Sequence, residues 1–598
     1  MADQKRNWRQ FQKLSFDSKR FSKRVKKAEG ATIRHAHKFI IKRLDSIRNV
    51  RRHIIGWLMV VSVLLVMVML QMMWFQKSYR TTAGAAGGTY AEATLGSIDT
   101  LNPLYASSSS ELSASNLLFS SLYDYDKTGG LQGDLAEKMS VSKDERVYTV
   151  DLVRAGLWHD GTKLTAKDVV FTVNLIKSPG ALSPLRSTWR DIKVEAVNDY
   201  SVRFTLPAPY AAFSHALTFA ILPEHLLHDV APESIRENTF SRSPVGSGPF
   251  QFRLLQTVNA SKGQKVLNLT AFNDYHRGAP LLGRFEIHSY ASQDDIVKAL
   301  QLGEVNASAD LSSANRDRLS ESAYNYQVKP IHSGVYALFN TTAPILENRS
   351  VRQALQLATH RSAVRDSVDP DAPLLQGPFV KGQLKDESLK LPEFSLKKAR
   401  SILEKEGYKR NGEGVFYKKG EPLSLRVVTV KNQEYERALA TLVGQWRTLG
   451  VEVTTEVIDA NDQSANFTQN VLQPRNYDVL VTELTIGADP DVYAYWHSSQ
   501  ASMAGRNFSN YASSNADLQL TSALSSIDPE LRNVKYHAFA EQWIRDAPAI
   551  GLYQSTIGYV SNKRLETLPG AEKLISSYDR YSQIIYWSVA KKPVYKTP

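Results

Sequence analysis

The longest apolar run of the chain lies close to its N-terminus. Residues 54–75 (IIGWLMVVSVLLVMVMLQMMWF) cover 22 positions without one charged side chain. As a helix they would extend about 33 Å, against about 30 Å for the hydrocarbon core of a bilayer. The pattern therefore predicts a single transmembrane helix over residues 54–75.

Beyond this run the hydrophobic pattern is typical of a folded α/β protein. Alternating apolar and polar positions predict half-buried strands at residues 147–153, 200–206 and 266–272. Helical spacing predicts helices at residues 165–176, 350–358, 395–406 and 434–449. A strand at 423–430, the helix 434–449 and a strand at 451–458 indicate a β-α-β unit. Both kinds of pattern together favour an α/β fold with mixed sheets.

Charge is concentrated before the apolar run. Residues 1–53 hold 17 of the 73 Lys and Arg and 4 of the 60 Asp and Glu, which leaves 56 of each sign in the remainder. The basic excess places the N-terminus in the cytoplasm and the large body outside the membrane. Because the body is neutral overall, it lacks a basic surface for phosphate backbones, and no nucleic-acid partner is expected.

The segments that flank the run leave alternatives open. From Ile33 to Arg52 apolar and basic positions alternate with helical spacing, which indicates an amphipathic helix on the inner leaflet or docked on a cytoplasmic partner. Residues 76–89 (QKSYRTTAGAAGGT) are predicted to form a short flexible linker. A signal peptide cleaved near residues 82–86 is the alternative to an anchor, although 53 residues make an unusually long leader.

Signatures of catalysis, cofactor binding and metal binding are missing from the sequence. The chain has no cysteine, no H-E-x-x-H, no P-loop lysine motif and no dinucleotide fingerprint. Ser395 and Lys398 match S-x-x-K, but they lie on a predicted amphipathic helix without companion motifs. We expect no enzyme activity, no cofactor and no metal site.

One block carries the clearest resemblance to a known family. Residues 152–168 read LVRAGLWHDGTKLTAKD, in which Gly161 suits a tight turn and Trp158 is expected to be buried. Thr165 and Asp168 have the spacing of a capping box at the start of a helix. The block closely resembles one in the solute-binding proteins of oligopeptide, dipeptide and nickel ABC importers (family 5). We expect it to support the fold rather than to bind ligand.

Shorter motifs extend this resemblance in the order of that family. They are Asp99–Pro103, Gly133–Glu137, Gly246–Phe250, Val351–Leu355, Ala399–Tyr408 and Asp489–Asp491. The match covers roughly residues 90–590, and His360 stands where the family usually has aspartate.

The resemblance implies two lobes that are joined by two crossing strands and close over a ligand. Carried onto this chain, it assigns residues 90–130, 244–333 and 556–598 to lobe I, 131–243 to an inserted subdomain and 334–555 to lobe II. It places hinges near Ser333, Tyr336, Gln554 and Thr556.

The resemblance also implies where a ligand binds. One wall of the cleft would be the run Ser107, Ser108, Ser109, Ser110 and Glu111, which faces residues 481–489. A helix cap in a solvated loop is the alternative interpretation of the serines. Peptide-binding members would hold an extended ligand through its backbone.

The chain departs from the family at the position that neutralises the amino terminus of a peptide. Ile486 stands where peptide binders usually carry aspartate. A buried ammonium needs a partner, so Glu483 is the first candidate, and Asp489 or Asp491 could also serve. The other interpretation is a ligand without a free amine, such as an oligosaccharide or a blocked peptide.

The function implied by the resemblance is an extracytoplasmic receptor that delivers a peptide-like ligand to ABC permease subunits. The receptor body is expected to be monomeric. The alternatives are a sensory or scaffolding protein whose output is the tail, a binder of an oligosaccharide or metal complex, and an outward-facing hydrolase that uses Ser395.

Overall fold

The computed structural model describes residues 22–595, except 24–25, 28–29, 32, 35–43, 386–387, 460–465, 564 and 566–571. Much of the predicted tail 1–53, with most of its amphipathic helix, therefore lies outside the described residues. The chain divides into two units, residues 1–83 with 592–598 and residues 84–591.

The first unit contains a long apolar helix. Helix α2 (Leu44–Tyr79) includes the 25-residue segment His53–Lys77, in which a window of 18 residues has a mean hydropathy of 2.5 and is not buried. This segment is long and apolar enough to cross a membrane. The predicted linker 76–89 contains the end of α2 and all of β1 (Arg80–Ala85), which pairs with β21 (Ala590–Tyr595). Composition alone gave no sign of this strand, because its partner comes from the other end of the chain.

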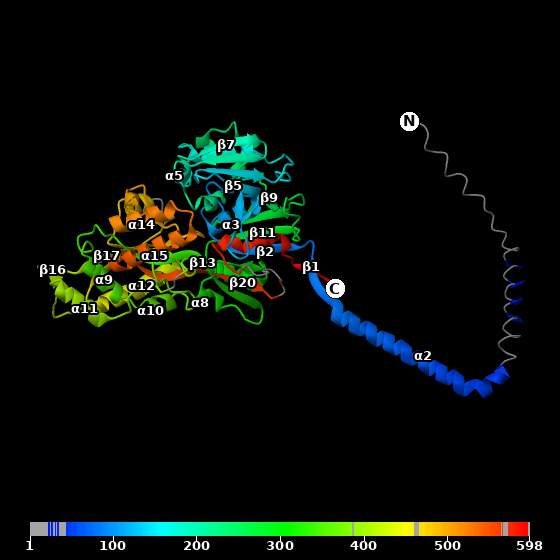
Figure 1. The fold of residues 1–598 in the computed structure, drawn as a ribbon. Coiled ribbons are helices and arrows are strands. Elements are labelled where there is room, and N and C mark those ends of the chain that lie inside the picture. The colour runs from blue at the N-terminus through cyan, green and yellow to red at the C-terminus, as the bar shows by residue number, and fades with distance from the viewer. Residues whose placement is uncertain are drawn as a thin grey trace. The chain divides into compact units, whose positions relative to one another are not determined.

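The second unit is built on a ten-stranded mixed sheet (Figure 1) with the order β18-β17-β19-β13-β20-β12-β2-β11-β10-β9. Its strands are β2 (Thr89–Leu95), β9 (Phe250–Asn259), β10 (Gln264–Ala271), β11 (Arg284–Tyr290), β12 (Ala307–Ser308), β13 (Tyr324–Phe339), β17 (Ser424–Val430), β18 (Glu452–Ile458), β19 (Val479–Thr485) and β20 (Ala549–Asn562). The long strands β13 and β20 pair antiparallel in the middle of the sheet and connect its two ends.

Helices cover both faces of the lobe II end of the sheet (Figure 1). They are α9 (Arg349–Leu357), α11 (Leu396–Lys405), α12 (Gln433–Leu449), α13 (Tyr493–Trp496), α14 (Ser514–Leu524) and α15 (Pro529–Asp546). Side chains of β13 alternate between two cores, because successive strand residues point to opposite faces. Val335 and Phe339 pack with α9, α11 and α12, whereas Tyr336 and Leu338 pack with α14 and α15.

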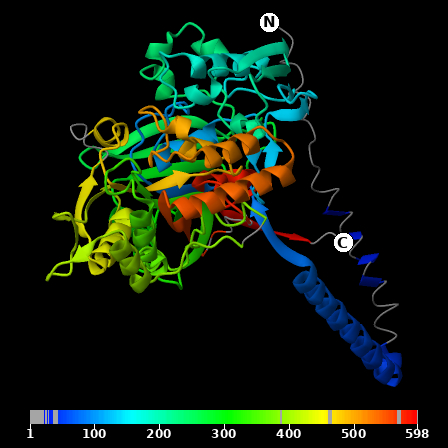
Figure 2. The same cartoon turned by 60° about the vertical axis from the view of Figure 1, so that its left-hand side comes forward.

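A separate four-stranded sheet falls within the range predicted for the inserted subdomain. It consists of β5 (Ala136–Val141), β6 (Val147–Leu152), β7 (Lys193–Asn198) and β8 (Ser201–Thr205), in the order β5-β6-β8-β7. In Figure 2 this cyan sheet lies at the top of the body, away from the yellow segment that contains α12. Helix α4 (Ala166–Lys177) packs against it over a core that includes Trp189 and Phe204.

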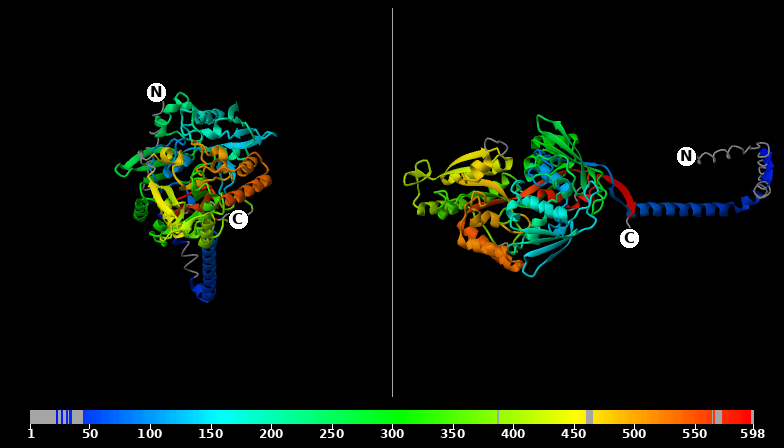
Figure 3. Two further views of the ribbon diagram at one scale, coloured as in Figure 1. Left: turned by 90° about the vertical axis from the view of Figure 1, so that its left-hand side faces the viewer. Right: turned by 90° about the horizontal axis from the view of Figure 1, so that it is seen from above.

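Short elements complete the second unit (Figure 3). The helices are α3 (Ser109–Leu118), α5 (Arg186–Trp189), α6 (Glu224–Leu227), α7 (Gln293–Leu302), α8 (Ser313–Arg316), α10 (Arg361–Asp366) and the 3-10 helix η7 (Ser577–Tyr586). The strands are β3 (Tyr123–Tyr125), β4 (Leu131–Gly133), β14 (Lys409–Arg410), β15 (Phe416–Lys418) and β16 (Glu421–Pro422).

The predicted α/β fold with mixed sheets is confirmed. The predicted β-α-β unit is present as β17, α12 and β18, and its two strands pair in parallel. The family block also folds as expected: Gly161 has a φ of 88° in its turn, and Trp158 is fully buried. Asp168 accepts the Thr165 amide at 2.8 Å at the start of α4.

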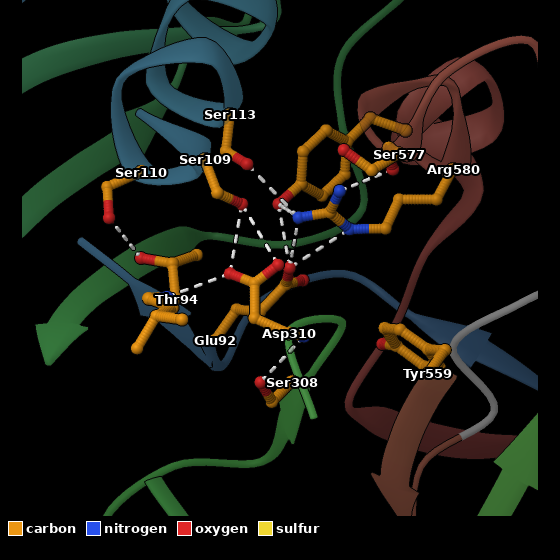
Figure 4. Close-up of polar contacts among 12 residues, drawn as sticks. Glu92, Thr94, Ser109, Ser110, Ser113, Ser308, Asp310, Tyr559, Ser577 and Arg580 are labelled. Carbon is orange, nitrogen blue, oxygen red and sulfur yellow. Dashed lines mark hydrogen bonds and ion pairs between the residues drawn. The ribbon is translucent and has the colours of Figure 1, made fainter. Parts of the chain in front are cut away.

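A buried charge network joins the C-terminal helix η7 to strand β2 (Figure 4). Arg580 on η7 forms an ion pair with Glu92 on β2, and its Nε donates to Glu92 Oε1 at 3.0 Å. The side chains of both residues are at most 2% exposed. Burial disfavours the charged guanidinium, but the carboxylate of Glu92 still holds the pKa of Arg580 above its ordinary value. The pair therefore depends on both partners remaining in place.

We expect Arg580→Gln to lower the free energy of unfolding by about 3–5 kcal/mol, because it leaves Glu92 buried without a counter-charge. Urea denaturation followed by tryptophan fluorescence measures the loss. Arg190→Gln is the matched control, since its pair with Asp191 is exposed and such pairs contribute less than about 1 kcal/mol. Equal effects of the two substitutions would contradict the prediction.

Candidate ligand-binding site

A cavity of about 580 Å³ is lined by segments from the ranges predicted for lobe I, the inserted subdomain and lobe II. It is lined by segments 103–125, 184–220, 485–491 and 575–578. Aromatic side chains provide much of its surface, namely Phe119, Tyr125, Trp189, Tyr210, Phe219 and Tyr578. No lysine or arginine occurs among the described residues that line it. The cavity thus has the size and the largely apolar lining of a site for a small ligand.

The two aspartates of the D-P-D motif line this cavity but have different partners. Asp489 is bound by both terminal nitrogens of Arg532 on α15, at 2.8 and 2.6 Å. Asp491 accepts the hydroxyl of Tyr210 at 3.1 Å and the amide of Tyr493 at 3.1 Å. Burial, with help from the charge of Asp489, raises the pKa of Asp491 above its usual value. Asp489 is thus neutralised by the protein, whereas Asp491 faces the cavity with neutral partners.

Two contacts hold the inserted subdomain against lobe II beside the cavity. One is the Tyr210–Asp491 hydrogen bond, and the other runs from the Ala211 amide to the Leu524 carbonyl at 3.1 Å. These contacts connect segment 210–211 to Asp491 and Leu524 beside the cavity.

The predicted serine wall has a structural role next to the cavity. Ser108 caps α3, and Glu111 accepts the amides of Asp99, Thr100, Ser107 and Ser108 at 2.9 to 3.2 Å. Ser109 donates to Asp310, and Ser110 shares a hydrogen bond with Thr94 at 2.7 Å (Figure 4). The neighbouring Ala106 and Leu112 line the cavity instead. These contacts are those of the helix-cap interpretation, and a contact between the serines and ligand stays a prediction.

The candidates for a counter-charge lie in different places. Glu483 accepts the Tyr435 hydroxyl at 3.1 Å and is not among the cavity-lining residues. Ile486 lines the cavity and donates its amide to the His332 carbonyl at 2.9 Å. Of the acidic residues predicted for the site, the structure brings Asp489 and Asp491 to the cavity.

The predicted hinge residues lie at an irregularity in the central strands. The pairing of β13 with β20 breaks between Pro330–Thr556 and Gly334–Gln554. Thr556 donates to Asp369 at 3.0 Å, and Gln554 donates to the Ile331 carbonyl at 2.9 Å. The regular pairing of the two strands is interrupted at this point, and bending there stays a prediction.

Comparison with known proteins identifies the family. The model of the bacterial extracellular solute-binding proteins, family 5, matches residues 130–505, which is more than half of the chain. The chain belongs to family 5 of the bacterial extracellular solute-binding proteins.

Two members of this fold show the likeness in detail. The oligopeptide-binding protein AppA of Bacillus subtilis is 29% identical over 487 residues, which cover 78% of this chain and 86% of AppA. Its solved complex with a nonapeptide has a TM-score of 0.72 at 25% identity and covers 85% of this chain and 100% of that one. NikZ of Campylobacter jejuni, solved with Ni(L-His), has a TM-score of 0.72 at 25% identity and covers 84% and 99% of the two chains.

Sequence reasoning missed the contribution of the inserted subdomain to this family 5 site. Tyr210, His215 and Phe219 line the cavity from a segment without regular strand or helix periodicity. Ile575 and Tyr578 reach it from the C-terminal segment. No spacing in the sequence marked these residues, because loops and 3-10 helices such as η7 carry no regular period that reveals their buried face.

We expect Tyr210→Phe to loosen the contact between the subdomain and lobe II. A hydrogen bond to a carboxylate contributes about 1.5–3 kcal/mol, so amide exchange near residues 208–216 and 488–496 should speed up about tenfold or more. Hydrogen–deuterium exchange with mass spectrometry measures it. Tyr586→Phe serves as the control, because Tyr586 is 60% exposed. Unchanged exchange in both segments would show that the contact does not hold the cleft closed.

Proposed function

We propose that this family 5 protein is an extracytoplasmic receptor that binds a peptide or peptide-like ligand between its lobes and presents it to ABC permease subunits. Residues 54–75 anchor it in the membrane with its N-terminus in the cytoplasm, and the body acts as a monomer without enzyme activity. The single observation that carries the proposal is the interlobe cavity, which is lined by both lobes and offers one carboxylate without a cationic partner.

The chemistry of the cavity favours a ligand with an amine. An ammonium group donates three hydrogen bonds and is costly to bury without an anion. Asp491 provides the anion, because its partners are a tyrosine hydroxyl and a backbone amide. Asp489 is already committed to Arg532. We therefore assign the counter-charge for a peptide's amino terminus to Asp491, with Glu483 as the competing candidate.

Closure follows from contacts that a ligand makes with both lobes. A ligand shifts the equilibrium between open and closed forms only as far as it binds the closed form more tightly. The cavity walls come from segment 103–125 of lobe I and segment 485–491 of lobe II. A peptide that contacts both walls is bound fully only after closure, with bending at Ser333, Tyr336, Gln554 and Thr556.

In this proposal the apolar segment anchors the protein in the membrane, and the body binds the ligand. The exposed apolar segment His53–Lys77 supports a membrane span. Two relatives, AppA and NikZ, are solved with a nonapeptide and with Ni(L-His) respectively. A metal complex and an oligosaccharide therefore remain alternative ligands, and a sensory role for the tail remains the alternative function.

We expect Asp491→Asn to weaken binding of Ala-Leu-Ala-Leu-Ala at least tenfold and to leave its N-acetylated form little changed, because only the free amine needs an anion. Isothermal titration calorimetry on the full chain in detergent measures both. Glu483→Gln is titrated in parallel. A loss caused by Glu483→Gln instead would transfer the role to Glu483. Failure of the wild type to bind any peptide would reject the peptide assignment.

We expect the protein to remain in the membrane pellet after an alkaline carbonate wash, with an intact N-terminus by mass spectrometry. A span of about 20 apolar residues binds the bilayer essentially irreversibly. Release of a body that begins near residues 82–86 would show that the apolar segment is a cleaved signal peptide.

A further inference from the structure

A second, smaller cavity adjoins the ligand cavity within lobe I. This side chamber has a volume of about 40 Å³ and shares Asn116, Phe119 and Ser121 with the larger cavity. Its remaining walls include Asp124 and Ser582. A water molecule needs about 10–15 Å³ of such space, so the side chamber has room for a group as small as an ammonium.

Asp134 is the first carboxylate of the side chamber, and His276 and Arg277 lie beside it. Asp134 accepts His276 Nε2 at 2.9 Å, the hydroxyl of Tyr275 at 3.2 Å and the amide of Ser121 at 3.1 Å, and Arg277 lies 3.8 Å away. Burial works against ionisation of Asp134, but His276 and Arg277 together hold its pKa below the usual value. Asp134 therefore remains an anion, with the hydrogen-bonded His276 and the guanidinium of Arg277 beside it.

Asp124 is the second carboxylate of the side chamber, and the charge of Arg277 acts more weakly on it than on Asp134. Within the part of the chain that the structure describes, its carboxylate accepts the amide of Tyr125 at 2.8 Å and forms no ion pair. It faces Asp134 after β4, Asp579 on η7 and Arg277 in the loop before β11. Burial, with the charges of Asp134 and Asp579, raises the pKa of Asp124 to about 7, against the opposing effects of the Tyr125 amide and Arg277.

An unsatisfied hydroxyl lines the same chamber. Ser582 is 7% exposed, and its Oγ has no hydrogen-bond partner among the described residues. Buried hydroxyls nearly always have a partner, and one left without costs about 1–3 kcal/mol. A group that donates hydrogen bonds and carries positive charge would satisfy both the carboxylate of Asp124 and the hydroxyl of Ser582.

We propose that the side chamber binds the ammonium tip of a basic side chain of the ligand, so that the receptor prefers peptides that contain lysine. This inference rests on the proposed function. Asp124 belongs to lobe I and Asp491 to lobe II, so a peptide with a free amino terminus and a lysine side chain is held by an anion on each lobe. Such a ligand favours the closed form more than a neutral one does.

The preference for lysine depends on pH with a definite sign. A bound cation stabilises the ionised form of Asp124 and lowers its pKa, so binding releases a proton when Asp124 is protonated beforehand. The lysine preference should therefore rise between pH 6 and pH 8 and fall off as Asp124 becomes protonated. Both peptides of a matched pair carry a free amino terminus, so its contribution to binding drops out of the ratio of their affinities.

The experiment compares tripeptides that carry lysine or norleucine at the same position, because norleucine keeps the apolar stem without the amine. Lysine is placed in turn at the second and third positions of an alanine tripeptide. Calorimetry on the full chain gives the ratio of the two Kd values at pH 6 and pH 8. We expect lysine to bind at least tenfold more tightly at pH 8 in one position, and the ratio to shrink at pH 6.

Asp124→Asn should bring this ratio to about one, and Ser582→Ala should lower it about threefold, while the exposed-site control Asp144→Asn should leave it unchanged. If Asp124→Asn does not fold, the two lysine positions and the variant Ser582→Ala still test the inference. Equal binding of lysine and norleucine peptides by the wild type would overturn the inference, leave the proposed function standing and assign the chamber to water. A preference that survives Asp124→Asn would also overturn it. Binding of neither peptide would reject both the inference and the proposed function.

Discussion

The pairing of β13 with β20 is the constraint on which the rest of the body depends. These two strands are bonded to each other and lie in the middle of the sheet, so their ladder joins its two ends. Close packing along these two strands leaves little space for larger side chains. A Cβ added to Gly558 on β20 would lie 2.0 Å from the guanidinium of Arg316, which itself pairs with Asp369 from the opposite lobe. The ladder therefore accommodates the buried ion pair of Arg316 and Asp369 beside its irregular pairing.

The cleft shows how a protein can treat similar carboxylates differently. Asp489 and Asp491 are two residues apart, and both line the cavity. The first is neutralised by Arg532, whereas the second keeps neutral hydrogen-bond partners. Since an unpaired buried charge is costly, a protein normally pairs every such group or leaves it exposed. A buried carboxylate with only neutral partners can gain a cationic partner from a ligand. On the proposed function, this property separates Asp491 from the structural Asp489.

The sequence predicted the parts of the fold that have a local period or a recognisable motif. The strands around β6, β8 and β10 and the unit β17-α12-β18 followed from alternation and helical spacing, and Gly161 and Asp168 behave as their motif indicated. The strand β1 escaped prediction because its partner β21 lies about five hundred residues away, and pairing over such separations leaves no local trace. The same reason explains which residues of the candidate site could be predicted. Asp489 and Asp491 belong to a motif and were found, whereas Tyr210 and Tyr578 reach the cavity only through tertiary packing. The run of serines has partners within the protein, with Ser108 as the cap of α3 and Ser109 bonded to Asp310, and its contact with ligand stays a prediction.

The single side chain of Glu111 fixes two stretches of loop at once. Its two oxygens accept amides from residues 99–100 and from residues 107–108, and these segments flank the cavity wall. Ordering a residue's backbone costs about 1–2 kcal/mol of conformational entropy. In this wall the cost is met during folding rather than when a ligand arrives, so little of the binding free energy is spent on ordering the receptor. Differences in affinity among ligands should then be expressed mainly in how slowly each one dissociates, because the wall is already formed at every encounter.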